Sequence, residues 1–587
     1  MLKKKYYLMK KLVSILLALT IALVFCAPAF AAASHTITSA EYPFCLMGMD
    51  LGMKKTLYFL DGVTDLPYVD TNGLLDMLNF SFGQDVDING KHISFTMETD
   101  GSIVTYTRHH EGSMSDGITA TFDFDRSEIK FQDFNLFLMK ARYSTVMDIT
   151  TTQFFNDQGE PLLLQKTDRG IVDRYGDEFV LPLVDYNIEL IWQPVENGLY
   201  LIPMQTVTDF IEAAGDGGNY FFNGQTINMV TSVASGDEAY YAAPTGERSA
   251  ALTEYGYNEL CLMLDYCYGL KEVHEISSFD EFFHKLGLDD LLKGDKVEYA
   301  DKAICRLIRD YLDDGHSVWG GFSYLTGDIE YTSPWGTSME KTRVQTATYK
   351  NARAAINPDG IPGYQEVGNT AYITFDSFAA DHNLSAEDYY KVEDPADFAD
   401  SNTIGLIIKA HAMITRENSP IENVVLDLSC NNGGDADAAA FVIAWFLGES
   451  SIGVKDTMTG AMSSCTYRCD ANLDRKFDEK DTLEGKNLFC LVSPLSFSCG
   501  NLVPCALKES GKVTLLGRTS GGGSCIVLFA SSAWGTSFRI SSPKRLSFIK
   551  NGSYYDIDRG ADPDFVITKI EKYYDRPALT DYINSLY

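Results

Sequence analysis

The sequence predicts an α/β core with a mostly parallel sheet, preceded by a helical subdomain and by a β-rich α+β N-terminal domain. Three observations lead to this prediction: short β-like runs between turn residues in the first part, apolar residues at three- and four-residue spacing in the middle, and strands alternating with helices at the end. With 587 residues, the chain is expected to form several domains. We expect them to follow the boundaries 1–33 (signal peptide), 34–235 (accessory domain, possibly two repeats), 250–350 (helical subdomain) and 351–587 (core).

The first 33 residues have the layout of a secretory signal peptide. A lysine-rich start precedes a long apolar run, and small residues with the sequence Ala-Phe-Ala follow. Cleavage after Ala31 would remove five lysines and no acidic residue, taking the formal charge from −33 to −38. We therefore expect a secreted or cell-surface protein, and an uncleaved membrane anchor is the alternative.

The composition argues against one class of partner. A net charge of −33 disfavours binding to the phosphates of nucleic acids and to anionic membrane surfaces. We expect no nucleic acid and no membrane contact beyond the signal segment, while the oligomeric state is left open. The twelve cysteines include no C-x-x-C pair, and the eleven that follow the signal segment are an odd number, so a full disulfide framework is not expected.

The accessory domain contains a weak internal repeat. "LPYVDTNGLLDMLNF" and "LYLIPMQTVTDFIEAA" each place a strand before a short amphipathic helix, and "DINGKHISF" and "FFNGQTINMV" have hairpin patterns. In this respect the region resembles the small domain named for the copper amine oxidase N-terminus. The resemblance implies no copper chemistry, and another kind of α+β accessory domain is the open alternative.

The middle and the end of the chain are patterned differently. Helices are predicted for "LTEYGYNELCLMLDYCYGL", "SFDEFFHKLGL" and "EYADKAICRLIRDYLDD". In the last third, the strand-like runs "TAYITFDSF", "VVLDLS", "NLFCLVSPL" and "KVTLLGR" alternate with the helical runs "IGLIIKAHAMITREN" and "ADAAAFVIAWFLG". Sites in such sheets lie at the carboxyl ends of strands, where Asn432 and Ser498 fall.

The stretch "LSFSCGN" places Ser498 among small residues where a strand passes into a helix. A hydroxyl at such a corner can face a substrate while backbone N–H groups point the same way. A serine is a weak nucleophile, so it needs a base within hydrogen-bond reach and a group that orients the base. His316 and Asp558 supply those residue types.

Several motifs resemble those of the carboxy-terminal processing and tricorn-type serine peptidases, the tail-specific protease family. "VVLDLSCNNGG" resembles the family's "DLRxNxGG", "SFSCGN" its "S-A-x-E" nucleophile corner, and "LLGRTSGGG" its "iG-x-x-T-x-G". "IDRGADPDFVIT" resembles the "E-x-G-V-x-P-D" ending and "YLDDGHS" the "D-x-H" element. The resemblance runs from about Thr253 to Ile570 and implies a core of crotonase-like βαβ units.

The resemblance assigns roles to the three candidate catalytic residues. Ser498 takes the place of the nucleophile. One branch of the family uses a lysine base after the serine, but Gly522 and Gly523 stand at that place, so the resemblance to the tricorn-like branch implies His316 as the base. Asp558 stands where the family has a glutamate and would orient the imidazole. The alternatives are an ordinary histidine and a plain acidic turn.

The oxyanion of an acyl transfer needs hydrogen-bond donors. The resemblance implies the backbone N–H groups of Gly433 or Gly434 and of Cys499. Two departures weaken the expectation of activity: Asn501 replaces the usual glutamate after the serine, and Ser429 replaces an arginine.

A separate acidic segment, "DANLDRKFDEKD", has the ligand spacing of an EF-hand or dockerin-type calcium loop. The expected ligands of a structural Ca²⁺ are Asp470, Asn472, Asp474, the Lys476 carbonyl, Asp478 and Asp481. Arg475 stands where glycine is usual and Asp481 where glutamate is usual, so weak binding is expected. A solvated acidic loop is the alternative, and no cofactor is expected for catalysis.

Taken together, these patterns predict an exported serine endopeptidase that cleaves proteins or peptides through a Ser-His-Asp triad and an acyl-enzyme, with a C-terminal preference implied by the family. The alternative is a cell-surface binding protein on a peptidase-like scaffold that has lost turnover. Carbohydrate hydrolysis lacks a paired-carboxylate motif in this sequence.

Overall fold

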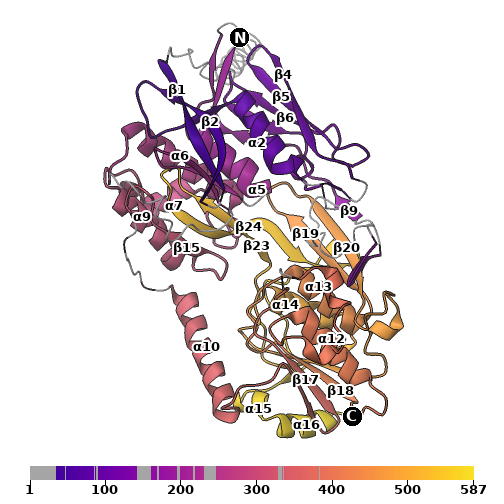
Figure 1. Cartoon of the computed structure of the whole chain (residues 1–587). Helices are drawn as coiled ribbons and strands as arrows, with labels where there is room; N and C mark the ends of the chain where they lie inside the picture. Colours follow the sequence, from indigo (N-terminus) through magenta and orange to yellow (C-terminus); the bar gives the residue numbers. More distant parts are fainter. Residues whose placement is uncertain are drawn as a thin grey trace, which may run out of the picture.

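The computed structural model describes most of the chain after the predicted signal segment. The described residues are 35–587 without 47, 85, 88–89, 142–159, 168–170, 195–197, 216–217, 231–245, 328, 330–333, 335 and 382–383. The predicted signal segment lies outside the described residues. Within them, no helix combines the length and the apolar character that a membrane crossing requires. Figure 1 shows an upper part built mainly from the N-terminal half and a lower part built from the C-terminal third.

The N-terminal region is β-rich, as predicted, and forms two sheets. One has the strand order β11-β12-β3-β2-β1-β14-β13 and the other the order β10-β7-β6-β5-β4. The strands of the first sheet are β1 (Ile37–Leu46), β2 (Met49–Leu60), β3 (Tyr68–Asp70), β11 (Ile191–Gln193), β12 (Leu199–Pro203), β13 (Asn219–Phe222) and β14 (Ile227–Val230). Those of the second are β4 (Ser94–Asp100), β5 (Ile103–His109), β6 (Thr119–Asp123), β7 (Glu128–Phe131) and β10 (Phe179–Pro182). Buried aromatic rings fill the space beneath them.

The two repeated sequence units meet in this region. In the first unit β3 runs into helix α2 (Thr71–Gly83), and in the second β12 runs into α4 (Met204–Val207), a π-helical turn over Thr208–Glu212 and α5 (Ala213–Gly215). β3 and β12 pair with each other in antiparallel register. The hairpin predicted at "FFNGQTINMV" is confirmed as β13 and β14.

The helical subdomain consists of α6 (Ala250–Cys267), α7 (Phe279–Leu286), α8 (Asp289–Leu292) and α9 (Val297–Arg306). Ser278 caps α7 by accepting a hydrogen bond from the Glu281 N–H. After α9 a π-helical segment, Leu307–Leu312, ends at Asp313 in the left-handed conformation. This ending turns the chain toward the loop that carries His316.

The C-terminal core contains a mostly parallel sheet in the order β16-β17-β18-β21-β22-β27, in which only the β16–β17 pair among the described residues is antiparallel. Its strands are β16 (Tyr364–Val367), β17 (Thr370–Thr374), β18 (Asn423–Asp427), β21 (Asn487–Val492), β22 (Val513–Gly517) and β27 (Phe565–Val566). The longer helices of the core are α12 (Thr403–Thr415), α13 (Ala436–Leu447) and α14 (Cys499–Glu509), and a short one is α11 (Ala386–Tyr389). The carboxyl ends of β18 and β21 lead into the two segments that carry the candidate site.

Another sheet crosses the predicted domain boundaries. It has the order β15-β24-β19-β20-β8, with β23 on β24 and β9 on β20. Its strands are β8 (Leu164–Lys166), β9 (Ile171–Arg174), β15 (Val318–Gly321), β19 (Ser450–Asp456), β20 (Met462–Cys469), β23 (Cys525–Ser531) and β24 (Ser537–Ser547). A small hairpin of β25 (Ile549–Lys550) and β26 (Ser553–Tyr554) follows. Strands from the accessory, helical and core segments thus share one sheet.

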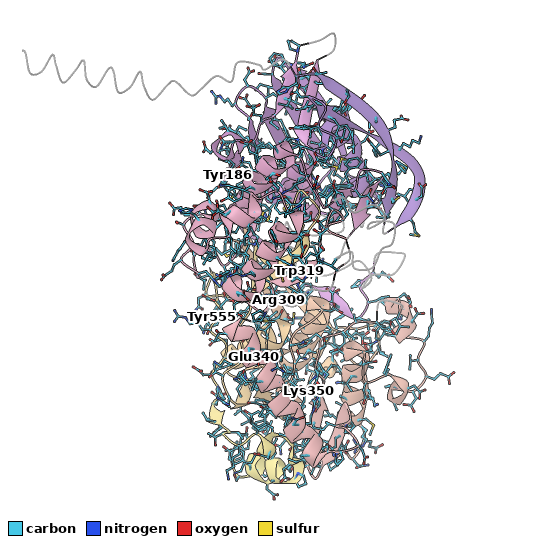
Figure 2. The ribbon with its side chains drawn as sticks, turned by 90° about the vertical axis from the view of Figure 1, so that its left-hand side faces the viewer. Tyr186, Arg309, Trp319, Glu340, Lys350 and Tyr555 are labelled. Atoms are coloured by element: carbon cyan, nitrogen blue, oxygen red, sulfur yellow. The ribbon has the colours of Figure 1, made fainter. Side chains whose placement is uncertain are left out.

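Helix α10 (Thr337–Ile356) lies between the upper and lower parts at the surface, with Glu340 and Lys350 labelled along it in Figure 2. Tyr349 is its one buried residue in the described chain and packs edge-on against Tyr573, with ring centroids 5.6 Å apart. At the other end, Asp313 accepts hydrogen bonds from the first backbone N–H groups of the helix. α10 is therefore fixed near its two ends and is otherwise largely solvated.

The last two helices, α15 (Glu571–Tyr574) and α16 (Arg576–Asn584), close one side of the parallel sheet. Arg576 donates to the Asp427 carboxylate at 2.6 Å and to the Thr374 hydroxyl at 2.9 Å. The side chains of Arg576 and Asp427 are only 2% and 1% exposed. This ion pair fixes the C-terminal helix to the carboxyl end of β18.

Arg576→Met is expected to lower the free energy of unfolding by about 3–5 kcal/mol, because it leaves a buried carboxylate without its cation. Urea denaturation measures the change. Arg343→Ala is the matched control, since it removes a solvent-exposed ion pair with Glu340 on α10 and should leave the midpoint unchanged. Equal midpoints for Arg576→Met and the wild type would contradict the prediction.

Candidate active site

Ser498 occupies a strained corner between β21 and α14. Its φ of 56° and ψ of −125° place it in a region that residues with a Cβ seldom adopt. It is the N-cap of α14, yet its hydroxyl makes no capping hydrogen bond to that helix. The hydroxyl is therefore left available at the start of a helix.

Hydrogen bonds to two neighbouring segments, the stretch after β18 and the loop that carries Gly522, hold this corner in place. The Ser498 N–H donates to the Gly522 carbonyl at 3.0 Å, and the Phe497 N–H donates to the Asn431 carbonyl at 3.1 Å. The Ser496 hydroxyl donates to the Leu428 carbonyl at 2.7 Å. The strain at Ser498 is thus imposed by neighbouring backbone and not by its own helix.

The "NNGG" turn after β18 lies directly against the serine. A Cβ on Gly433, whose φ is 106°, would lie 2.6 Å from the Ser498 Cβ. A Cβ on Gly434, whose φ is 131°, would lie 2.0 Å from the Phe378 carbonyl oxygen. Both positions therefore need glycine, for conformation and for space.

The structure distinguishes the predicted oxyanion donors. The Gly433 N–H already donates to the Asn431 side-chain oxygen at 2.9 Å. In contrast, the N–H groups of Gly434 and Cys499 make no hydrogen bond to any described residue, and both residues line the same cavity as Ser498. Two backbone donors are thus available beside the serine.

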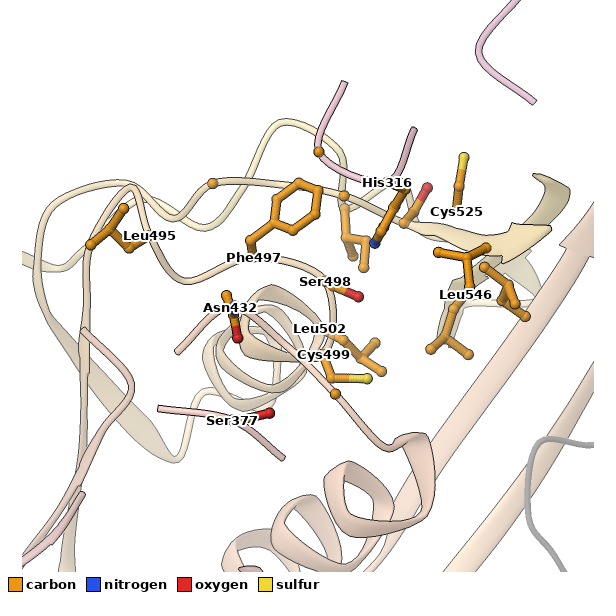
Figure 3. A pocket seen from close by; sticks show the side chains of 18 of the residues that line it. His316, Ser377, Asn432, Leu495, Phe497, Ser498, Cys499, Leu502, Cys525 and Leu546 are labelled. Carbon is orange, nitrogen blue, oxygen red and sulfur yellow. The ribbon is translucent and has the colours of Figure 1, made fainter. Parts of the chain in front are cut away.

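This cavity has a volume of about 1050 Å³ and brings Ser498 and His316 together. Figure 3 shows His316 over the corner that carries Ser498, with Phe497 beside it. One wall comes from α10, whose lining residues recur at four-residue spacing along one helical face: Ser338, Thr342, Thr346 and Lys350. No hydrogen bond joins the Ser498 hydroxyl to His316 in this structure.

Asp314 shapes the turn that presents His316, a role that the sequence analysis missed. Its carboxylate accepts hydrogen bonds from the backbone N–H groups of His316 and Ser317 at 2.9 and 2.8 Å. It also accepts from the hydroxyls of Ser317, Tyr268 and Ser541. An aspartate two residues before the histidine is the sequence signal of such a turn, but its remote partners have no local signal.

The imidazole of His316 is buried, with 8% of the residue exposed, and its ring centroid lies 4.8 Å from that of Phe497. Burial lowers the pKa of His316 to about 4, because desolvation disfavours the imidazolium. Asp314 opposes this shift and Arg539 adds to it. The histidine is therefore neutral at physiological pH, the form that a general base requires.

The structure does not join Asp558 to His316. The Asp558 carboxylate accepts from the Ser524 N–H at 2.7 Å and forms an ion pair with Arg545. It is not among the residues that line the cavity, and no hydrogen bond links it to the imidazole. Its orienting role stays a prediction.

The two departures from the family pattern have defined contacts. Asn501 is fully buried; its side chain donates to the Ile557 carbonyl at 2.8 Å and accepts from the Ser520 hydroxyl at 2.7 Å. Ser429 contacts the Tyr574 hydroxyl at 3.2 Å. Asn501 thus fixes the segment next to Asp558 to helix α14.

The predicted calcium loop is held by its own hydrogen bonds. Asp470 accepts from the N–H groups of Asp474 and Arg475, and Asp481 accepts from those of Ala471, Asn472 and Asp478. Arg475 has a φ of 61°, the conformation for which glycine is usual at this place. Among the described residues no group of three or more His, Cys, Asp or Glu side chains is placed to hold a metal ion. Calcium binding stays a prediction.

Two buried cysteines lie at the cavity. The eleven described cysteines are all buried, among them Cys499 and Cys525, which line the cavity. Burial raises the pKa of both thiols, to about 12 for Cys499 and about 11 for Cys525. Neither thiol is a thiolate at neutral pH, so Ser498 is the better candidate nucleophile at this site.

Residues 369–567, which run from β17 to β27, match the model of peptidase family S41. Over these residues the chain is similar to the serine peptidases of family S41. Ser498, Gly434, Cys499 and Asp558 lie inside the S41 segment, whereas His316 lies before it. No match was found among curated proteins.

Solved structures similar to this chain include other peptidases. A photosystem II D1 C-terminal processing protease is 17% identical, with 36% of this chain and 47% of that chain covered and a TM-score of 0.25. A putative peptidase from Parabacteroides merdae is 14% identical, with coverages of 55% and 93% and a TM-score of 0.36. The tricorn protease is 12% identical, with coverages of 85% and 63% and a TM-score of 0.30.

The chain spans less than half of the length of the processing protease. The TM-scores of the three structures are too low to support a conclusion about the site of this chain. They also leave the copper amine oxidase-like accessory domain untested, so that resemblance stays a prediction.

Gly433→Ala is expected to lower the free energy of unfolding by about 1–3 kcal/mol more than Gly511→Ala, because only the first adds a clash to a left-handed backbone. Gly511, with a φ of 69° and open space around it, serves as the control for strain alone. Thermal or urea unfolding measures both variants. If both variants lost the same free energy of unfolding, the prediction would be wrong, because the Ser498 corner would then make room for the added Cβ without loss of stability.

Proposed function

We propose that this chain is an exported serine endopeptidase that hydrolyses peptide bonds through Ser498 and His316. The observation that carries the proposal is their placement: a serine on strained backbone and a buried, neutral histidine line one cavity, with the free N–H groups of Gly434 and Cys499 beside the serine. The signal-like first 33 residues support export.

In the proposed reaction the Ser498 hydroxyl attacks the peptide carbonyl carbon while His316 takes the hydroxyl proton. The carbonyl oxygen becomes an oxyanion that accepts hydrogen bonds from the N–H groups of Gly434 and Cys499. His316 returns the proton to the leaving amine, and the C–N bond breaks to leave an acyl-enzyme. Water, deprotonated by the same histidine, then hydrolyses the ester and releases Ser498.

Two aspartates have different proposed roles around the base. Asp314 holds the backbone of the His316 turn through its five hydrogen bonds and acts as a positioning residue. Asp558 is proposed as the third member of the triad, the residue that orients the imidazole. This role requires its carboxylate to leave Arg545 when substrate binds. Apo geometry is often looser than the geometry of the reacting complex.

The test uses residues 34–587 with a fluorogenic unfolded protein, with and without calcium. Ser498→Ala and His316→Ala are each expected to lower kcat by at least about 10³-fold, because each removes a member of one catalytic unit. Asp558→Asn tests the proposed orienting role of this aspartate. The control is Lys569→Gln, which changes an exposed residue outside the cavity.

Loss of activity in both Ser498→Ala and His316→Ala, with the control active, supports the proposal. An unchanged rate for His316→Ala would assign the base elsewhere. An inert wild type whose Ser498 also resists acylating probes would overturn the peptidase reading and favour the binding-protein alternative.

The acid limb of the kcat/KM profile is expected near pH 4, not near the ordinary histidine value, because the base must be neutral and burial lowers its pKa. Activity therefore rises as the pH passes upward through about 4 and is level near neutrality. Arg539→Gln removes a positive charge near the imidazole, so it should move the limb to higher pH. A limb that shifts downward in this variant would contradict the assignment.

A further inference from the structure

The carbonyl of Gly433 and the N–H of Gly434 belong to one trans peptide unit. Such a unit is planar and its C=O and N–H point in opposite directions, so hydrogen bonds to one group orient the other. The Gly433 carbonyl accepts from the Phe378 N–H at 2.8 Å and from the Ser377 hydroxyl at 3.1 Å. These two bonds turn the Gly434 N–H, the proposed oxyanion donor, away from Ser377 and Phe378.

The segment 376–378, which follows β17, also holds the backbone on both sides of this peptide. The Asn432 N–H donates to the Asp376 carbonyl at 3.2 Å, and the Asp435 N–H donates to the Phe378 carbonyl at 2.9 Å. The orientation of the oxyanion donor therefore depends on where this segment lies.

Helix α10 binds this segment through a bidentate ion pair. Nη1 and Nη2 of Arg353 donate to Oδ1 and Oδ2 of Asp376 at 2.7 and 2.6 Å. The planar fork of a guanidinium matches a carboxylate in this way, and both side chains are partly buried. Arg353 also lies close enough to Cys430 to oppose the burial that raises the pKa of that thiol. The ion pair thus fixes the end of α10 beside the turn that carries the oxyanion donor.

The other end of α10 begins at the loop that carries the proposed base. The Asp313 carboxylate accepts from the N–H groups of Ser338 and Met339 at 2.7 and 3.1 Å. Asp313 lies three residues before His316 in the sequence. With 20 residues, α10 spans about 30 Å, and it joins the His316 loop to the segment that orients the Gly434 N–H.

A second contact holds the end of α10 that carries Arg353. Tyr349, one turn before Arg353, is buried and packs against Tyr573. Loss of the ion pair alone should therefore leave the helix in place. A change at Arg353 then tests the orientation of the 376–378 segment, not the folding of α10.

We propose that Arg353 is a positioning residue of the candidate active site. Through Asp376 it fixes the peptide between Gly433 and Gly434 in the orientation that presents the Gly434 N–H to the oxyanion. This inference rests on the proposed peptidase function and deepens it, since it makes a helix outside residues 369–567 part of oxyanion stabilisation.

Kinetics distinguish this role from a merely structural one. Arg353→Met is expected to lower kcat by about 10-fold or more while KM changes less than about threefold, because the oxyanion forms only on the way to the transition state. A loosened cavity wall would instead raise KM, since α10 lines the cavity. Arg353→Lys keeps the charge without the planar fork and should restore part of kcat.

Two further variants sharpen the comparison. Ser377→Ala leaves the ion pair intact and removes one bond to the Gly433 carbonyl, so it should lower kcat by less than Arg353→Met. Arg343→Met is the matched control, because Arg343 binds Glu340 with two nitrogens on the same helix but outside the cavity. It should keep the wild-type kcat. A wild-type kcat in Arg353→Met, a loss confined to KM, or an equal loss in the control would overturn the proposal.

A peptide aldehyde tests the oxyanion directly. The Ser498 oxygen adds to the aldehyde carbon, the hydroxyl proton passes to His316, and the carbonyl oxygen becomes an oxyanion in the same place as in the reaction. The inhibition constant should therefore rise in Arg353→Met by about the factor by which kcat/KM falls. An inhibition constant that keeps its wild-type value would contradict the positioning role.

Amide hydrogen exchange separates this inference from the proposed function, since it needs no turnover. In the Ser498→Ala background, the N–H groups of Asn432 and Asp435, which donate to the segment 376–378, should exchange at least about 10-fold faster when Arg353→Met is added. The control variant on the same helix should leave both rates unchanged. Faster exchange supports the positioning role even if the wild type proves inert. Unchanged exchange would overturn it even if the wild type is an active peptidase.

Discussion

The backbone of Ser498 is held in the left-handed region, and the whole candidate site depends on that constraint. The strain turns the hydroxyl away from its own helix, while bonds to the Gly522 carbonyl and from the Phe497 N–H keep the corner closed. Because the corner is so tight, the adjoining turn has room only for glycine at Gly433. The same packing leaves the N–H groups of Gly434 and Cys499 without partners, in the place where an oxyanion needs donors.

Burial sets the electrostatics of the site. The imidazole of His316 packs on Phe497 and is neutral because its charged form is poorly solvated there. Burial also lowers the pKa of Arg539, while the charge of Asp314 opposes this shift. A neutral base and a cationic side chain can therefore coexist in the cavity of a strongly acidic protein.

The proposed base, His316, and the proposed nucleophile, Ser498, come from segments far apart in the chain, and one sheet fixes their relative positions. β15, directly after His316, pairs with β24, while β24 also pairs with β19 and β23 of the core. Strands β8 and β9 of the N-terminal half complete this sheet through β20. Any shift of the helical subdomain against the core would thus have to break strand pairing before it separated His316 from Ser498.

The sequence by itself determined the local elements. The apolar runs predicted β17, β18, β21 and β22, and the three- and four-residue spacing predicted α6, α7 and α9, because such patterns act between residues a few positions apart. It also placed Asn432 and Ser498 at strand ends, where sites gather. Only the tertiary structure decided which side chains meet: that Asp314 holds the His316 turn, that Asp558 pairs with Arg545, and that Arg539 donates to the carbonyl of His316. Arg539 and His316 are 223 residues apart in the chain, and no local pattern in the sequence encodes the packing that brings them together.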